Sequence, residues 1–204
     1  TPIKSSAASD VYKRQIYRKN VGGGLLRSPE KIRALARAIR ENWGGVFSVK
    51  MRLGFDSSDA FEELFSAVLD GGPDFVTVHA RTVKQLYRGG CDYSKIALAV
   101  RMSPVPVIAN GDIWSARKAL EVARQTNCAG VMAGRHAVRN PWIFRQISEA
   151  ARSETPYSPT LGEVREYVGE ILDSVIASSA RYPDSRMKKF LNFIGASICL
   201  LYTS

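Results

Sequence analysis

The sequence predicts an α/β protein, namely the C-terminal half of a TIM (β/α)8 barrel followed by the start of an all-helical domain. Four short apolar runs alternate with helical segments at intervals of roughly 25 to 30 residues, the spacing of parallel strands joined by helices. Polar residues follow the ends of all four runs, as in a barrel, whereas a doubly wound sheet binds its ligand at one crevice. After residue 160 the helical period continues without any strand.

Composition limits the class of protein. The 204 residues are 45% hydrophobic and 24% charged, which suffices for one core with an appendage. A net charge of +10 favours a polyanionic partner, nucleic acid before a membrane surface. The cysteines Cys91, Cys128 and Cys199 lack paired spacing, so neither a disulfide framework nor a metal site is predicted. No apolar run approaches the roughly 18 residues of a membrane span, and we expect a cytoplasmic monomer.

The two ends differ in character from the chain between them. Residues 1–15 are polar and unpatterned, and they carry no cap or strand pattern. Together with residues 199–204 they resemble translated adapter tails at the edges of sequence fragments. We therefore expect both segments to be non-native and both natural ends to be missing, and we exclude them from reasoning about the fold.

The first regular element predicted is a helix that begins after Ser28. Ser28 suits the N-cap, Pro29 suits the first helical position, and the pair Gly44-Gly45 ends the helix. Its apolar face consists of Ile32, Leu35, Ala36 and Ile39. Residues 47–52 then alternate between apolar and polar side chains, which predicts a strand with one polar face.

Three further strand and helix units follow. A helix carrying Phe61, Leu64, Phe65, Val68 and Leu69 leads to a strand over residues 75–79. A helix over about residues 94–102 leads to the strand that ends at Asn110, and Ser115 caps the next helix. The last strand begins at Gly130, and Asn140-Pro141 opens another helix. The partial barrel is thus expected to cover residues 16–153.

A helical domain is expected over residues 160–198, with a boundary near residues 154–159. Thr160 and Glu163 have the spacing of a capping box, and apolar residues at helical spacing follow as far as Ile176. A second helix is predicted to bury Met187, Phe190, Leu191 and Ile194, and to place Arg186, Lys188 and Lys189 off that face.

Lys50 is the most informative candidate for a binding site. Its neighbours on the strand are apolar, so its ammonium would point into the mouth of the barrel, where an unpaired charge costs several kcal/mol. Alternatively, the side chain could extend to solvent or pair with a carboxylate such as Asp112. An anionic or electron-rich ligand is favoured because three other strand ends also carry polar groups.

Those polar groups are His79, the turn Asn110-Gly111-Asp112, and the pair Gly134-Arg135. His79 could equally be structural, and the turn could be ordinary turn chemistry. The loops after the last two strands of a barrel form its usual phosphate site. An arginine fork and backbone amides at Gly134-Arg135 would suit a phosphate monoester.

Several motifs resemble those of the tRNA-dihydrouridine synthases, over about residues 16–198. They are Gly22-Gly-Gly-Leu-Leu26, Val49-Lys-Met-Arg-Leu-Gly-Phe55, Val78-His-Ala-Arg-Thr82 with Gln85, Tyr87 and Gly89, Pro106-Val-Ile-Ala-Asn-Gly-Asp-Ile113, and Gly130-Val-Met-Ala-Gly-Arg135 through Asn140-Pro-Trp-Ile-Phe144. Each motif alone is weak, but their order and separations make chance an unconvincing explanation.

The resemblance implies an FMN-bearing barrel with a helical domain, which reduces the C5–C6 bond of selected tRNA uridines with NADPH as hydride source. By matching positions, Lys50 and His79 would contact the flavin ring system. Asn110, Gly111 and Asp112 would bind along the cofactor, and Gly134 and Arg135 would hold its phosphate. Arg81 would lie near the RNA or the substrate base, and Arg186, Lys188 and Lys189 would face the tRNA backbone.

One departure from the family pattern concerns the general acid. The family's acid is a cysteine in an Asn-x-Gly-Cys-Pro segment, and matching the basic run before Gly22 places that position at Val11. None of the three cysteines present replaces it, so we expect the chain as written to be inactive. Two alternatives stay open: another FMN-dependent barrel oxidoreductase acting on a small molecule, resembling dihydroorotate dehydrogenase, and a non-catalytic RNA-binding relic.

Overall fold

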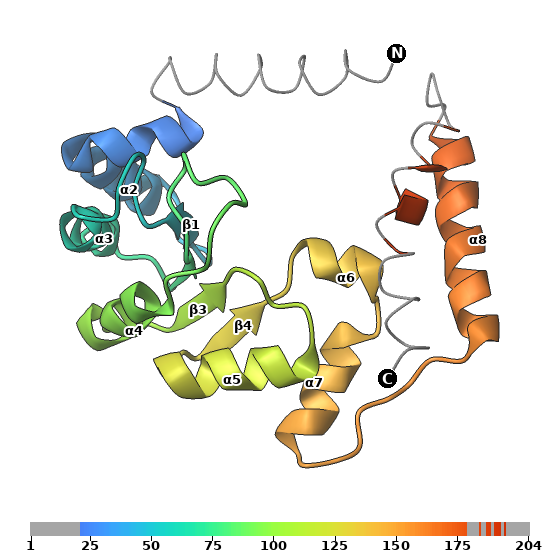
Figure 1. The fold of residues 1–204 in the computed structure, drawn as a ribbon. Helices are drawn as coiled ribbons and strands as arrows, with labels where there is room; N and C mark the ends of the chain where they lie inside the picture. Colours follow the sequence, from blue (N-terminus) through green and yellow to red (C-terminus); the bar gives the residue numbers. More distant parts are fainter. Residues whose placement is uncertain (1–20, 179–183, 185–186, 189, 193, 195–204) are drawn as a thin grey trace. The chain divides into compact units, whose positions relative to one another are not determined.

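The computed structural model describes residues 21–178, 184, 187, 188, 190–192 and 194 (Figure 1). The predictions made for residues 1–15 and 199–204, including the one for Val11, fall outside these residues. The described chain divides into two compact units. The first comprises residues 21–112 and 121–132, and the second comprises residues 113–120 and those from 133 onward.

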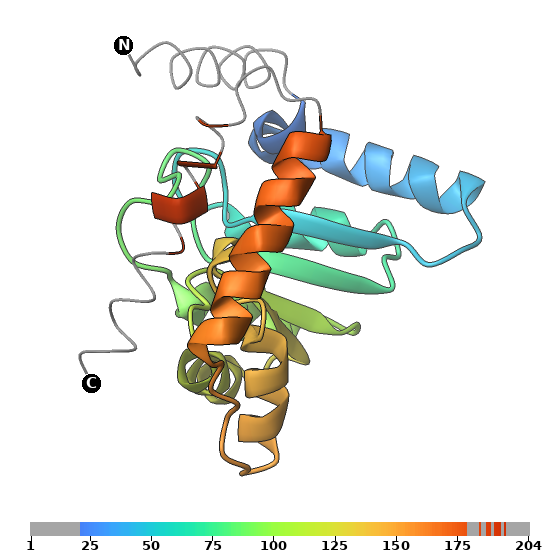
Figure 2. The ribbon, with the colours of Figure 1, turned by 90° about the vertical axis from the view of Figure 1, so that its right-hand side faces the viewer.

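A four-stranded parallel sheet forms the centre of the first unit. Its strands are β1 (Ser48–Arg52), β2 (Phe75–His79), β3 (Val107–Asn110) and β4 (Gly130–Met132), paired in that order. The register aligns Arg52 with His79 and His79 with Asn110, so three successive strands end side by side. Figure 2 shows the strands from the side, running in one direction. The predicted fold class, α/β with half of a TIM barrel, is confirmed.

Helices of the first unit cover one side of this sheet (Figure 1). They are the 3-10 helix η1 (Gly22–Arg27), α2 (Pro29–Asn42), α3 (Phe61–Leu69) and α4 (Tyr93–Met102). Ser28 stands at the N-cap of α2, but its hydroxyl donates to Glu30 Oε2 rather than accepting from the helix. Helix α4 begins one residue earlier than predicted, because the Asp92 carboxylate accepts from the Ser94 N–H.

The core of the first unit lies between the helices and the sheet. Phe61, Leu64, Phe65 and Val68 of α3 are buried, as their helical spacing predicts. The apolar residues of the strands, including Val76, Val78 and Ala109, are buried as well. Leu35 and Ile39 of α2 are expected on the buried face, yet 47% and 37% of their surfaces are exposed. Both border a groove beside β1, which is an edge strand among the described residues.

Helix α5 (Ala116–Thr126) contributes to both units, and its cap is the predicted one. The Ser115 hydroxyl accepts from the Lys118 N–H at 3.1 Å. Further along, the second unit contains α6 (Arg135–Arg139), α7 (Ile143–Ala151) and α8 (Leu161–Ala177). The separate short helix α6 is not among the predicted elements. None of the described helices is both long and apolar enough to cross a bilayer.

The connection between α7 and α8 is fixed by side chains. Glu149 accepts from Arg145 Nε and from the Tyr157 N–H, both at 2.6 Å, and Tyr157 OH donates to Glu163. Thr160 and Glu163 form the predicted capping box at the start of α8. Beyond α8, the described residues from 184 to 194 are helical, and Met187 and Ile194 are buried as predicted. Leu191 is not, since 45% of its surface is exposed.

Candidate functional site

Lys50 and Asn110 meet across the middle of the sheet. Lys50 Nζ donates to Asn110 Oδ1 at 3.0 Å, and Asn110 Nδ2 donates to the Met132 carbonyl at 2.8 Å. Because β2 lies between β1 and β3, this contact spans three strands on the polar face of the sheet. Partial burial, and then the charge of Arg52, lower the pKa of Lys50. The expected alternation of β1 therefore does place Lys50 on the face where Asn110 lies. Lys50 is opposite Thr77, two residues before the end of β1, so it does not lie at a strand end as predicted.

His79 is buried at the end of β2, where the register places it between Arg52 and Asn110. Only 7% of its surface is exposed, and its Nδ1 has no hydrogen-bond partner. Burial, and then the positive charges of Arg52, Lys50 and Arg81, lower the pKa of His79 to about 4. At neutral pH the imidazole is therefore uncharged. Burying a nitrogen without a hydrogen-bond partner costs free energy and is rare in protein interiors. The unpartnered Nδ1 therefore indicates a site for a ligand.

The turn that follows Asn110 has an unusual backbone. Gly111 has a φ of +124° and Asp112 a φ of +48°. A Cβ at Gly111 would lie 2.7 Å from Cys91 Sγ, so a side chain there would force the thiol aside. Tyr93 OH donates to the Gly111 carbonyl at 2.9 Å. Glycine is thus required here both for φ and for space.

Arg81 forms a partly buried ion pair with Asp112 of this turn. Both terminal nitrogens of Arg81 donate to the two oxygens of Asp112, at 2.8 and 2.6 Å, and Nη2 also donates to the Gly89 carbonyl. Only 3% of the Arg81 side chain is exposed. The roles predicted for these residues, toward RNA and cofactor, remain predictions. In the structure each is bound to the other, and the paired geometry holds the turn.

Cys91 packs beside the same ion pair. Burial, and then the negative charge of Asp112, raise the pKa of its thiol to about 11. The thiol is therefore protonated at neutral pH, and it fills the space that a side chain at Gly111 would need. This cysteine packs against the turn, and its exclusion as the family's acid stays a prediction.

Sequence reasoning missed Arg52 and Tyr93. Arg52 Nη1 donates to the carbonyls of Thr82 and Leu86, at 2.7 and 3.1 Å, and so fastens the loop after β2 to β1. The alternation of β1, which singles out Lys50, puts Arg52 on the same face and could have identified it. No comparable pattern points to the bond between Tyr93 and Gly111.

Gly134 and Arg135 belong to the second unit. Gly134 precedes α6, and Arg135 is the exposed first residue of that helix. A Cβ built at Gly134 would meet nothing within 4 Å among the described atoms, so space in the protein does not require a glycine. Their assignment to a cofactor phosphate stays a prediction. Of the proposed RNA residues, Lys188 is exposed, whereas Arg186 and Lys189 fall outside the described chain.

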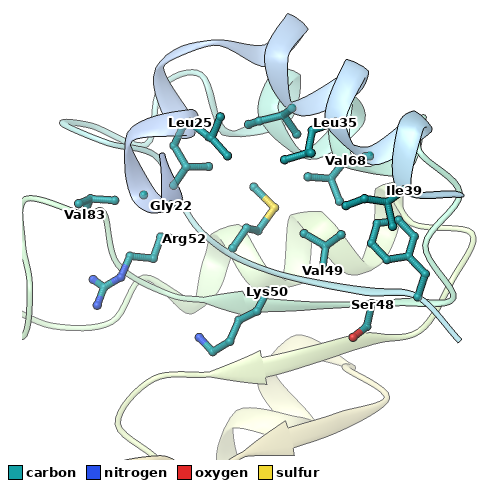
Figure 3. A pocket seen from close by; sticks show the side chains of 16 residues that line it. Gly22, Leu25, Leu35, Ile39, Ser48, Val49, Lys50, Arg52, Val68 and Val83 are labelled. Carbon is teal, nitrogen blue, oxygen red and sulfur yellow. The ribbon is translucent and has the colours of Figure 1, made fainter. Parts of the chain in front are cut away.

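A groove of about 530 Å³ lies between η1, α2 and β1 (Figure 3). Leu25, Leu35 and Val68 point into it, which makes its lining largely apolar. Lys50 and Arg52 contribute to its boundary, but Figure 3 shows their side chains directed away from these apolar groups. The groove is therefore distinct from the polar face that carries Lys50, His79 and Asn110.

Comparison with known proteins identifies relatives of this chain. A family model described as "Dihydrouridine synthase (Dus)" matches residues 13–194. A probable tRNA-dihydrouridine synthase of Helicobacter pylori is 44% identical over 128 residues, covering 62% of this chain and 39% of the relative. One of Rhodobacter capsulatus is 32% identical over 162 residues, covering 78% and 50%. A tRNA-dihydrouridine(16) synthase of Neisseria meningitidis is 28% identical over 183 residues, covering 88% and 55%. The chain thus spans about two fifths to one half of these relatives.

Proposed function

The chain belongs to the dihydrouridine synthase family, and from this premise we propose that it is part of a flavin-dependent enzyme that reduces uridines in tRNA. The bond reduced is the C5–C6 double bond of the uracil, and NADPH is the source of the hydride. Since the chain spans about half of its relatives, the activity is proposed for the whole protein. We place that protein in the cytoplasm as a monomer, together with its tRNA substrate.

The buried His79 Nδ1 without a partner is the observation that supports this proposal best. It lies at the end of β2, in register with Arg52 of β1 and Asn110 of β3, and Lys50 lies two residues before Arg52. An ammonium group, a neutral imidazole and an amide can all donate hydrogen bonds to a heterocycle with carbonyl oxygens. The residues present therefore fit FMN, which when bound would supply hydride chemistry.

The chain's own residues would hold and orient the reacting partners. Asn110 keeps Lys50 on the polar face, since its amide joins Lys50 to the Met132 carbonyl. The Arg81–Asp112 pair and Tyr93 hold the turn behind Asn110. We assign Gly134 and Arg135 to the cofactor phosphate. The strand residues Lys50, His79 and Asn110 would thus contact the cofactor, and the ion pair and Tyr93 would position them.

A proton donor must serve the uracil carbon that does not receive the hydride. We propose that this chain lacks that donor, because Val11 stands at the position expected for the family's cysteine. Cys91 is not a substitute, since its thiol packs against Gly111 and its pKa is raised. The 204-residue chain is then expected to leave tRNA uridines unreduced even when flavin is supplied.

The proposal is tested on the protein encoded by the full natural reading frame that contains this chain. We expect it to purify with flavin absorbance and to form dihydrouridine in tRNA from a strain deleted for the gene. Changing both Lys50 and His79 to Ala should remove the flavin, whereas changing the exposed Lys84 to Ala should not. If the double variant contains as much flavin as the unaltered protein, the assignment of Lys50 and His79 to flavin binding is wrong. If the protein binds flavin but reduces a small molecule and no tRNA, the proposed tRNA substrate is wrong.

A further inference from the structure

A basic and aromatic surface lies in the second unit, where the beginning of α5 meets α6. We call it the Trp114 patch, and it consists of Trp114, Lys118, His136 and Arg139. Half of the Trp114 surface is exposed, although its ring is large and apolar. Lys118 Nζ lies 5.6 Å from the centre of that ring, and the His136 ring meets it edge-on at 6.4 Å.

Charge in the second unit is unevenly distributed. Residues 113–120 and 133–144 contain Arg117, Lys118, Arg135 and Arg139 but no Asp or Glu, whereas the next basic residue, Arg145, pairs with Glu149. Helix α8 has the opposite character, with one basic residue, Arg165, against four acidic ones, Glu163, Glu166, Glu170 and Asp173. A polyanion would therefore be attracted to the Trp114 patch and repelled along α8.

We propose that the Trp114 patch binds the RNA outside the reacting uridine. The basic side chains would neutralise phosphates, and the exposed indole would stack on an unpaired base. Lys118 lies over the ring, and the exposed half of Trp114 leaves surface for a base. An exposed aromatic residue surrounded by cations is the usual arrangement for binding single-stranded nucleic acid. That the RNA is tRNA rests on the proposed function.

The Trp114 patch also differs from the surface that the family resemblance implies. The resemblance implies that Arg186, Lys188 and Lys189 face the tRNA backbone. The helix that precedes them, α8, is acidic, whereas the Trp114 patch combines cations with an exposed ring. Stacking on an aromatic ring is possible for every base, so the Trp114 patch would increase the affinity for RNA without selecting which uridine is reduced.

The test measures binding of an unmodified tRNA transcript to the full 204-residue chain by fluorescence anisotropy. We expect Trp114→Ala to weaken binding roughly tenfold, and Trp114→Phe to retain most of it, because a ring can still stack. Trp43→Ala is the matched control. Trp43 is 57% exposed in the first unit, and its indole N–H donates to the Val46 carbonyl. Its replacement should leave the affinity unchanged.

Salt dependence separates the two parts of the surface. Arg139→Ala should reduce the slope of log affinity against log salt by about one, whereas Trp114→Ala should leave the slope unchanged. Equal affinities for Trp114→Ala, Trp43→Ala and the parent chain would overturn the proposal. Loss of affinity in both Trp114→Ala and Trp114→Phe, to the same extent, would equally overturn stacking.

The outcome can be told apart from failure of the proposed function. Flavin content and dihydrouridine formation are measured on the full natural protein, independently of this titration. If Trp114→Ala binds tRNA normally while the Lys50 and His79 double variant loses flavin, only the RNA surface is wrong. If Trp114→Ala loses flavin in the full protein but keeps its RNA affinity, the patch belongs to the cofactor site and the inference fails.

Discussion

At the scale of single residues, the protonation state of His79 is set by the charged groups around it. The groups that face it are mainly positive, namely Arg52, Lys50 and Arg81, with Asp112 as the nearby acid. A second proton would add another positive charge to a buried position. The same features that keep the imidazole neutral also leave its Nδ1 available to a ligand. Protonation of this side chain is therefore expected to lower stability and to occupy the nitrogen that a ligand would contact.

This protonation predicts a loss of stability in acid. The pKa of His79 is about 4 in the folded chain and about 6.5 unfolded, so between these values the unfolded state binds more protons. Stability should therefore be fully present above about pH 6.5 and fall as the pH drops toward 4, by on the order of 3 kcal/mol. Urea unfolding across this pH range measures the effect.

The matched variant is His79→Gln, which carries no proton in this range. Carboxylates that do not interact with His79 titrate equally in both chains, so the difference between the two pH profiles reports His79 and its coupling to Asp112. We expect the parent chain to lose stability relative to the variant as the pH falls from about 6.5 to about 4. Parallel profiles for the two chains would contradict a buried, neutral imidazole.

Much of the site at this scale could be predicted from sequence, and the reason is register. Parallel strands end at one edge, so the order of the apolar runs suffices to place Lys50, His79 and Asn110 on neighbouring strands. The ion pairs between side chains could not be predicted in the same way. Asp112 is a candidate partner for Lys50 by sequence, but it binds Arg81, which lies on the loop after the next strand. Such choices depend on side-chain geometry across loops.

At the scale of elements, the helix ends follow from their capping residues wherever those residues bind as their types predict. Ser115 and Thr160 accept from helix N–H groups as expected. Ser28 does not, because its hydroxyl donates to the Glu30 carboxylate instead. Helix α6 was missed since its five residues are too few for an apolar period to show. The exposure of Leu35 and Ile39 reflects the groove beside an edge strand, which helical spacing alone does not reveal.

The capping box of α8 gives a prediction for this element. Thr160 Oγ1 accepts from the Glu163 N–H at 3.3 Å, and Glu163 Oε2 accepts from the Thr160 N–H at 2.8 Å. Thr160→Ala should lower the free energy of unfolding by about 1 kcal/mol, because an N–H at the helix start loses its partner. Urea unfolding followed by far-ultraviolet circular dichroism measures the change.

Two variants make this result specific. Thr160→Ser keeps the hydroxyl and should retain most of the stability. Thr155→Ala removes an exposed threonine from the same connection and should have little effect. If Thr155→Ala costs as much as Thr160→Ala, the connection as a whole rather than the cap determines stability. If neither has an effect, the start of α8 is held by the contact of Tyr157 with Glu163 instead.

At the scale of the whole molecule, the sheet is the feature with the widest consequence. Among the described residues, β1 pairs with β2 only, so its other edge offers unpaired backbone groups. Apolar surface surrounds this edge: Val46 is 75% exposed, Trp43 57% and Leu35 47%. An open edge with an apolar border favours association with another strand, and an eight-stranded barrel satisfies this need by closing.

We therefore predict that the 204-residue chain associates as its concentration rises, and that Val46→Lys reduces this association. A lysine beside an edge strand opposes strand pairing, because its ammonium would have to be desolvated. Sedimentation velocity over a concentration series measures the effect. Ile176→Lys is the control, since Ile176 is 59% exposed on α8 and the substitution adds the same charge. If Ile176→Lys reduces association as strongly, the added charge rather than the edge of β1 is responsible, and the open edge does not direct the contact.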